Sequence, residues 1–393
     1  MTTLFEILLT TMAASVLVPT TTLWLEVLCA AVKRSDPMGV APGRPPIAVL
    51  IPAYNEAATI TETLQSIMRQ LTGADRILVV ADNCSDDTAE IASAAGAEVI
   101  TRTVPALRGK GYALDLGVRH LRERPPPIIV IIDSDCQVSP GSIDQLARRC
   151  AAAARPVQAL YLMRAPQGAG LKMRIAEFAW IVKNRVRPLG LSALNLPCQL
   201  MGTGMAFPWE CIGSANLATG HLVEDLKLGV ELARTGRPPL FCEQALVTSY
   251  YPASEEGIHG QRRRWEHGHL GMIAKEAPLL LLKALRSLDI GLLAMSLDLA
   301  VPPLSLLSLL VTVTWLAAAV FAALTGLTFP LEIAILAIVL LVLSVMISWV
   351  RYGRGTLSLR DLASAPVYAL WKLPLYVSFI VSRQLEWVRS KRD

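Results

Sequence analysis

The feature that most constrains this chain is the position of its long apolar stretches, which lie near the two ends and leave a mixed region between them. The first stretch covers residues 3–32, which is long enough to cross a bilayer. Lys33 and Arg34 follow it, whereas a cleaved signal peptide carries its positive charge before the apolar run. We therefore predict an uncleaved anchor, residues 1–34, with its C-terminal end inside and with Glu26 near enough to that end to reach the interface.

The last third of the chain is strongly apolar again. Residues 304–324 and 331–350 are each long enough to span a bilayer, and arginines follow the second stretch, which places that end inside. Residues 363–382 are also apolar but contain Lys372 and a proline. A full span there would put the basic tail outside, so we favour a surface-lying or re-entrant segment, with a third span as the alternative. Residues 276–393 are assigned to interfacial and transmembrane helices.

Composition supports this division into a membrane part and a water-exposed part. Apolar residues make up 53% of the 393 residues and charged residues 18%, which is unusual both for a soluble enzyme and for a chain of spans alone. Basic residues gather at 262–264 and 389–392, and we interpret them as a phosphate-binding patch and a membrane-surface tail, not as a nucleic-acid interface. The seven scattered cysteines include no Cys-x-x-Cys pair, which fits a reducing compartment.

The region between the apolar stretches, residues 47–275, alternates short apolar runs with helical stretches after a proline-rich linker. Strands are predicted at residues 47–52, 76–81, 98–102 and 128–132, and helices at 59–70, 88–95 and 112–122. This order predicts a mostly parallel sheet covered by helices on both faces. Ligands of such sheets bind at the carboxyl ends of the strands, so polar residues that follow strands are the first candidates for a site.

Asp133-Ser134-Asp135 follows the all-apolar strand 128–132. Two carboxylates one residue apart at this edge can supply oxygen ligands to a hard divalent cation, which would neutralise a diphosphate. The alternative is a solvated turn that caps the next helix.

The first two strands are also followed by polar side chains. Asp82 comes directly after the second strand, where its carboxylate can accept hydrogen bonds from a base such as uracil. Tyr54 and Glu56 follow the first strand and offer an aromatic face and a carboxylate to the same edge. Turn and helix-cap chemistry is the alternative for these residues.

Two further motifs lie at predicted helix starts. Lys110 lies between two glycines, where close backbone approach and a helix N-terminus favour an anion, although the spacing is not that of a Walker P-loop. Glu224-Asp225 opens an amphipathic stretch and is either a helix cap or a general base that deprotonates an acceptor hydroxyl.

The most specific string is Gln261-Arg-Arg-Arg-Trp265. Clustered arginines match the geometry of a diphosphate, and the adjacent tryptophan offers a flat apolar face for a sugar ring. The alternative is a basic collar that contacts lipid headgroups, since apolar residues follow soon after.

Taken in this order, the motifs resemble those of the family 2 glycosyltransferases over roughly residues 47–269. The Gln-x-x-Arg-Trp element is similar to that of the membrane-integrated members, such as cellulose, chitin and hyaluronan synthases and ceramide glucosyltransferase. The resemblance implies an α/β, GT-A-like nucleotide-diphospho-sugar transferase domain with a mostly parallel sheet at residues 47–275. N- and C-terminal transmembrane helices would flank this cytoplasmic domain.

The resemblance also implies a role for each motif. Asp225, beside Glu224, would be the catalytic base of an inverting single displacement. Trp265 would lie under the acceptor sugar, and Gly204 would line the acceptor side. Asp135, with help from Asp133, would hold Mg²⁺ or Mn²⁺. The residues implied in donor binding are Tyr54, Glu56, Asp82, Lys110, Asp133, Gln261 and Arg264.

The implied reaction transfers a sugar from a nucleotide-diphosphate donor, preferably a UDP-sugar, to a glycan acceptor in extracellular or cell-surface polysaccharide synthesis. A glycolipid synthase or polyprenyl-phosphate sugar transferase, with a lipid acceptor, is the alternative. A transporter or scaffold with a degenerate transferase domain is disfavoured, because all the expected charged residues are present. The expected partners are the donor, the acceptor and membrane lipids, without nucleic acid, and a homo-oligomer stays open. We expect a multi-pass protein of the inner membrane with its catalytic domain in the cytoplasm.

Overall fold

The computed structural model describes residues 2–32, 41, 43–252 and 254–382, which form two compact units. The sheet unit contains the described residues of 41–166 and 197–269. The helical unit contains residues 2–32, 167–196 and 270–382. Residues 167–196 and 270–275 of the predicted domain 47–275 group with the helical unit, and the bounds of that domain stay a prediction.

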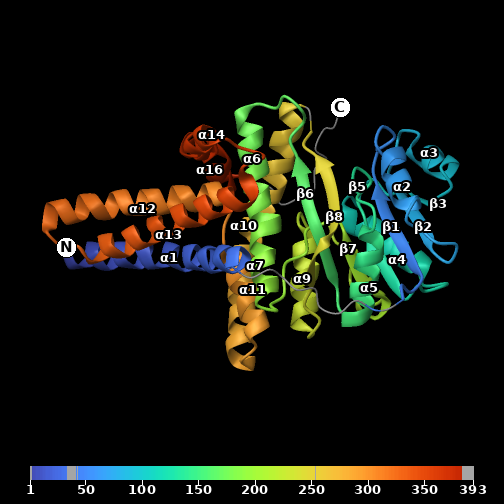
Figure 1. Ribbon diagram of the computed structural model, residues 1–393, viewed down its shortest axis with the longest axis horizontal. Coiled ribbons are helices and arrows are strands. Elements are labelled where there is room, and N and C mark those ends of the chain that lie inside the picture. The colour runs from blue at the N-terminus through green and yellow to red at the C-terminus, as the bar shows by residue number, and fades with distance from the viewer. Residues whose placement is uncertain (1, 33–40, 42, 253, 383–393) are drawn as a thin grey trace. The chain divides into compact units, whose positions relative to one another are not determined.

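The sheet unit is built on an eight-stranded sheet in the order β3-β2-β1-β4-β7-β6-β8-β5 (Figure 1). Strands β3, β2, β1 and β4 are parallel, and so are β6 and β8, whereas β7 is antiparallel to both of its neighbours. The fold is therefore α/β and GT-A-like, as predicted. The strands are β1 (Ile47–Ala53), β2 (Arg76–Asp82), β3 (Glu98–Arg102), β4 (Ile128–Ile131), β5 (Gln137–Val138), β6 (Val157–Arg164), β7 (Met205–Pro208) and β8 (Leu240–Tyr250).

The alternation of side chains along the strands explains how both faces of the sheet are covered. Leu50, Leu78 and Ile129 share one face and pack in a single core cluster with Leu114 and Leu121 of α4 (Lys110–Leu121). On the sheet, α5 (Ser142–Ala153) contacts β4, β6, β7 and β8. The remaining helices of this part are α2 (Ile60–Met68), α3 (Thr88–Ala94), α8 (Trp209–Ile212) and α9 (Glu224–Arg234).

Three helices of the helical unit pack side by side, namely α1 (Thr2–Val32), α12 (Leu304–Thr325) and α13 (Phe329–Ser348) (Figure 1). They are the helices of the described residues that are long and apolar enough to cross a membrane. Ala13, Ala318 and Ala334 are fully buried where the three meet, because small side chains let apolar helices approach closely. Helix α13 continues into a π-helical turn, η2 (Trp349–Gly353).

The segment 167–196 adds α6 (Leu171–Ile181), the π-helical turn η1 (Val182–Val186) and α7 (Arg187–Ala193) to the helical unit. Arg187 is buried and pairs with Glu26 Oε2 at 3.0 Å and with Asp298 Oδ1 of α11 (Ile290–Ala300) at 2.5 Å. The Glu26 carboxylate is therefore buried against an arginine within the protein, and its position at the membrane interface stays a prediction. Sequence reasoning had no sign of that partner, which lies far away along the chain.

The C-terminal apolar stretch is not one continuous helix. It is divided into α15 (Ala365–Trp371) and α16 (Leu373–Val381), with Lys372 between them and a proline in the first turn of each. Neither helix has the length of a span, which favours the surface-lying or re-entrant prediction. The other helices are α10 (Glu255–Ser287) and α14 (Leu359–Ala363). Lys33, Arg34 and the basic tail at 389–392 lie outside the described residues.

Candidate active site

The carboxylates predicted to hold a metal lie directly after β4. Ligand atoms of Asp133, Asp135 and Cys136 all lie within 4.8 Å of one another. The Cys136 thiol donates to Asp135 Oδ1 at 3.7 Å, and burial raises its pKa well above the usual value, so it stays a neutral thiol. The two carboxylates are therefore the hard ligands of this group, and they fit a divalent cation that also binds phosphate oxygens.

A loop at residues 201–204 supports this turn from the next strand of the sheet. The backbone N–H of Asp133 donates to the buried Thr203 Oγ1 at 3.0 Å. Gln158, which is fully buried on β6, donates to Thr203 O at 2.8 Å and accepts from the N–H of Met201 at 2.8 Å. Thr203 and Gln158 were not predicted as site residues, and they hold the loop in a single position.

Lys110 connects the metal-binding turn to this loop. Its ammonium group forms an ion pair with Asp133 Oδ1 and donates to Gly202 O at 2.6 Å. Burial lowers the pKa of Lys110, but the nearby carboxylates of Asp133, Glu224 and Asp225 outweigh burial and raise it above the usual value. Lys110 therefore remains a cation at neutral pH, placed at the N-terminus of α4 as the sequence predicted.

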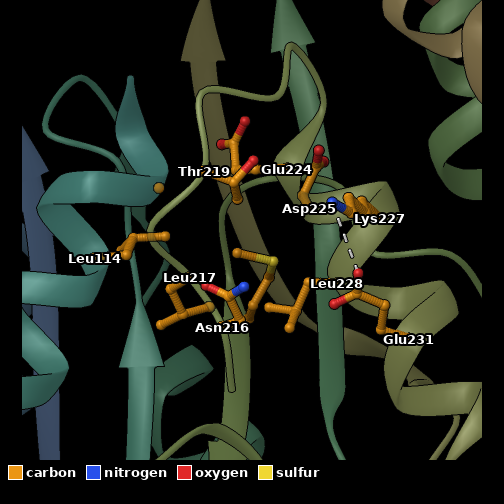
Figure 2. A pocket seen from close by; sticks show the side chains of 11 residues that line it. Leu114, Asn216, Leu217, Thr219, Glu224, Asp225, Lys227, Leu228 and Glu231 are labelled. Carbon is orange, nitrogen blue, oxygen red and sulfur yellow. Dashed lines mark ion pairs between the residues drawn. The ribbon is translucent and has the colours of Figure 1, made fainter. Parts of the chain in front are cut away.

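Glu224 and Asp225 begin α9 and lie beside Lys110. A Cβ built on Gly202 would lie 3.4 Å from Asp225 Oδ2 and 4.0 Å from Lys110 Nζ, so the three residues border one small space. Burial and the charge of Asp225 raise the pKa of Glu224 to about 7, although Lys110 and Arg264 lower it. Figure 2 shows the two carboxylates in the lining of a pocket that Leu114, Leu217 and Leu228 also line.

Helix α10 places the arginine cluster close to this pair. A Cβ on Gly268 would lie only 2.6 Å from Val223 Cγ1, so α10 approaches the residue before Glu224 at a position that needs a glycine. Arg264 acts electrostatically on Glu224 and favours its ionised form. Gln261 is buried in the same turn region of α10, and Trp265 is half-buried there.

The ends of β1 and β2 form a second polar region. Asp82 is buried, and its Oδ1 accepts from Arg102 Nη1 at 2.6 Å. Glu56 accepts from the Thr59 hydroxyl at 2.9 Å, so its side chain supports the start of α2 as well as this region. Tyr54 is half-buried beside them in the chain.

The structure thus brings together Lys110, Asp133, Glu224, Asp225 and Arg264. Gly204 is buried and does not border the carboxylates. A Cβ at Gly204 would meet the side chains of Ala159 and Val247 in the sheet, whereas one at Gly202 would meet Asp225. The acceptor role predicted for Gly204 stays a prediction. Arg102 was missed, although it ends the third predicted strand and the strand-end rule used for Asp82 applies to it equally.

A half-buried lysine beside an Asp-x-Asp turn, an acidic pair at a helix start and an arginine-bearing helix lie together on a GT-A-like sheet, as the family resemblance implied. The family model "Glycosyltransferase like family 2" matches residues 45–268. The chain therefore belongs to glycosyltransferase family 2.

Individual proteins resemble parts of the chain or its fold. A mannosyltransferase from Pyrobaculum calidifontis, solved with GDP-mannose and Mn²⁺, is similar with a TM-score of 0.59, covering 98% of this chain and 100% of its own at 18% identity. Glucosyl-3-phosphoglycerate synthase of Mycobacterium tuberculosis is 40% identical over 23% of this chain and 28% of its own length. An uncharacterized protein of Methanocaldococcus jannaschii is 34% identical over 26% and 40%. The chain thus spans less than half of these two curated relatives.

Proposed function

We propose that the chain is a membrane-bound, inverting glycosyltransferase that moves a sugar from a UDP-sugar to an acceptor used in cell-surface polysaccharide synthesis. The observation that carries the proposal is the meeting of Lys110, Asp133 and Asp225 around the loop that contains Gly202. A cation, a metal-binding carboxylate and a free carboxylate are the three groups needed for a diphosphate leaving group and an acceptor hydroxyl.

The donor would bind with its diphosphate near Lys110 and with its nucleobase against Asp82. Asp133 and Asp135 would hold Mg²⁺ or Mn²⁺, which supplies positive charge to the departing diphosphate. The solved mannosyltransferase with Mn²⁺ supports this cofactor, since the two folds are alike over nearly the whole chain. Arg264 and Gln261 would add donors to the diphosphate from α10.

The transfer itself needs one proton acceptor and one displacement. Asp225 Oδ2 would take the proton of an acceptor hydroxyl while that oxygen attacks the anomeric carbon. The bond from the anomeric carbon to the diphosphate oxygen breaks with its electron pair leaving on the nucleotide, so the configuration inverts. Lys110 and Arg264 would stabilise the charge that develops on the leaving group.

A membrane location is supported by the helical unit. The Tyr352 hydroxyl donates to Ala30 O at 3.0 Å, which joins the C-terminal end of α1 to the end of the α13–η2 helix. At this end Arg185 lies 5.1 Å from the Tyr352 ring and Arg354 5.5 Å from the Trp349 ring. Aromatic side chains are typical of the membrane–water interface, and basic side chains at the ends of spans are typical of its cytoplasmic side. We propose a multi-pass protein of the inner membrane with the sheet unit in the cytoplasm.

A lipid acceptor is the second candidate, and one observation favours it. Helix α10 carries the arginine cluster in its first turns and exposes Leu279, Leu282 and Leu285 towards its end. Exposed leucines on a helix that follows a catalytic motif suit the acyl or prenyl chain of a lipid-linked acceptor.

The proposal is tested with full-length protein in detergent, Mn²⁺, membrane lipids and a panel of UDP-sugars, by measuring UDP release and the mass of the product. Asp225→Asn should reduce kcat about 100- to 10,000-fold, because the general base is lost while the site keeps its shape. Asp144→Asn is the control, since Asp144 pairs with Arg148 on the surface of α5. Turnover by Asp225→Asn at the wild-type rate would remove Asp225 as the base. A single lipid-linked sugar as product would favour the second candidate, and a long glycan the first.

A further inference from the structure

The carboxylate of Asp82 has a specific buried partner. Asp82 ends β2 and Arg102 ends β3, and the parallel register places these two residues opposite each other. Arg102 Nη1 lies 2.6 Å from Asp82 Oδ1, and the two side chains are only 10% and 8% exposed. A charged pair this deeply buried at the ligand edge of the sheet orients the carboxylate firmly.

A second donor reaches the same oxygen. Asn83 Nδ2 donates to Asp82 Oδ1 at 3.0 Å. The Asn83 backbone N–H donates to Arg102 O at 2.6 Å, and its side-chain Oδ1 accepts from the N–H of Val104 at 2.7 Å. Asn83 also has a φ of 53°, a conformation that asparagine tolerates better than most residues. The amide is therefore held in place on both sides.

Arg102 is itself held by two contacts besides the ion pair. Its Nη1 donates to Leu107 O at 2.9 Å. Its Cζ lies 5.1 Å from the centroid of the Tyr112 ring on α4, within the range of a cation–π contact. The guanidinium cannot turn away from Asp82 without losing both interactions.

These contacts make the two oxygens of Asp82 unequal. A carboxylate oxygen offers about two acceptor sites, and Oδ1 uses both on Arg102 and Asn83. Oδ2 accepts no hydrogen bond from the part of the chain that the structure describes. Uracil presents one imide N–H, which one free oxygen satisfies. Guanine presents two adjacent donors, N1–H and the amino group, which need both oxygens.

We propose that Arg102 and Asn83 are positioning residues that saturate one oxygen of Asp82, so that the site selects a pyrimidine imide such as uracil over guanine. This inference rests on the proposed function, in which Asp82 meets the nucleobase of the donor. It assigns base selection to residues that lie behind the contacting carboxylate.

Charge supports the same role. Burial raises the pKa of Asp82, and the Arg102 guanidinium opposes this rise, so the arginine favours the ionised form of the acceptor. The Cys84 thiol also lies near Asp82, and its pKa is raised first by burial and also by the Asp86 and Asp82 carboxylates. The Cys84 thiol therefore stays neutral and cannot supply the positive charge that Arg102 provides to Asp82.

The test is calorimetric titration of the full-length protein in detergent with UDP and with GDP, in the presence of Mn²⁺, from pH 6 to 8.5. The wild type should bind UDP about 100-fold or more tightly than GDP, because guanine would leave a buried donor unpaired. Arg102→Met should weaken UDP binding about tenfold at pH 8, and more as the pH falls and Asp82 takes up a proton. The preference for UDP over GDP should narrow, and Arg102→Lys should restore part of it.

Arg76→Met is the matched control. Arg76 pairs with Glu98 at 3.0 Å between the same two strands, at their opposite ends, so it tests the loss of an ion pair without touching Asp82. It should leave both affinities unchanged. If Arg102→Met does not fold, Asn83→Gly removes the second donor while tolerating the positive φ, and it should also narrow the preference.

Two results would overturn the inference: equal binding of UDP and GDP by the wild type, or an Arg102→Met protein with wild-type UDP affinity and pH profile. A UDP preference that depends on Arg102, in a protein that transfers sugar from no UDP-sugar, would support base selection and refute the proposed transferase reaction. Binding of neither nucleotide would refute both.

Discussion

At the scale of single residues, the acidic pair at the start of α9 shows how adjacent carboxyl groups acquire different chemistry. Glu224 is half-buried near Asp225, and burial together with that neighbouring charge raises its pKa to about 7. A carboxyl group in such surroundings holds its proton over much of the acidic range. Glu224 is therefore suited to holding a proton beside Asp225, and Asp225 is suited to accepting the proton of the acceptor hydroxyl.

The raised pKa of Glu224 predicts a pH-dependent effect of Glu224→Gln on stability. A carboxyl group whose pKa is raised on folding contributes stability that is complete below its unfolded value, 4.5, and is lost as the pH rises towards 7. The neutral glutamine avoids that loss. Thermal unfolding in metal-free detergent buffer should therefore show a higher Tm for the variant than for the wild type at pH 8, with a smaller difference at pH 5.

Glu231→Gln is the comparison for this measurement, since Glu231 lies further along α9 in an exposed pair with Lys227. The difference in Tm between Glu231→Gln and the wild type should change less between pH 5 and pH 8. An equal Tm difference for Glu224→Gln at pH 5 and pH 8 would contradict the assignment of the raised pKa to Glu224.

Residues that follow strands or open helices could be predicted from the sequence, and their partners could not. Asp82, Asp133 and Lys110 were identified because the carboxyl edge of a parallel sheet collects ligand-binding residues. Arg102 and Thr203 act through cross-strand register and hydrogen bonds between segments far apart in the chain. The strand-end rule draws attention to Arg102 itself, but a single sequence does not reveal that its partner is Asp82.

At the scale of elements, the contact of α10 with the residues before α9 brings the arginine-bearing helix to the acidic pair. The contact depends on Gly268, whose α-carbon lies against the Val223 side chain. Any side chain at this position must push the two elements apart, because packed interiors have little free space. The arginine cluster and the acidic pair therefore depend on one close approach.

Gly268→Ala should lower kcat/KM and destabilise the protein by about 1–3 kcal/mol, because its Cβ would lie 2.6 Å from Val223 Cγ1. Adding Val223→Ala removes that clash and should restore most of the activity. The measurement is kcat/KM and Tm for both single variants and the double variant. If the double variant loses as much activity and stability as the two single variants lose together, the close approach of Gly268 to Val223 is not the cause.

The element boundaries predicted between residues 47 and 132 agree with the structure within one or two residues, because each strand there is a short apolar run between polar turns. The strands β5 to β8 and the helices α5 and α8 were not predicted. The strand 98–102 agrees with β3, and the predicted span 304–324 agrees with α12 to one residue. The role of residues 167–196 could not be predicted. Their helices carry mixed apolar and basic residues that suit a soluble domain equally well. Contacts with segments far along the chain, such as the pairing of Arg187 with Glu26, show where they pack.

At the scale of the whole molecule, the chain combines a family 2 transferase sheet with a helical unit gathered from three separate segments. Arg187 lies in the middle segment, residues 167–196. It pairs with Glu26 of the N-terminal segment and with Asp298 of the C-terminal segment. Removing one partner of such a buried cluster leaves a charge without compensation, so we expect it to destabilise the helical unit.

The anomeric configuration of the product tests the central claim most directly. The donor sugar is α-linked to its diphosphate in a UDP-sugar such as UDP-glucose, and a single displacement assisted by Asp225 inverts that carbon. We expect NMR of the isolated product to show a β-linkage, formed by the wild type and not by Asp225→Asn. An α-linked product would require a different displacement and would contradict the mechanism proposed for this site.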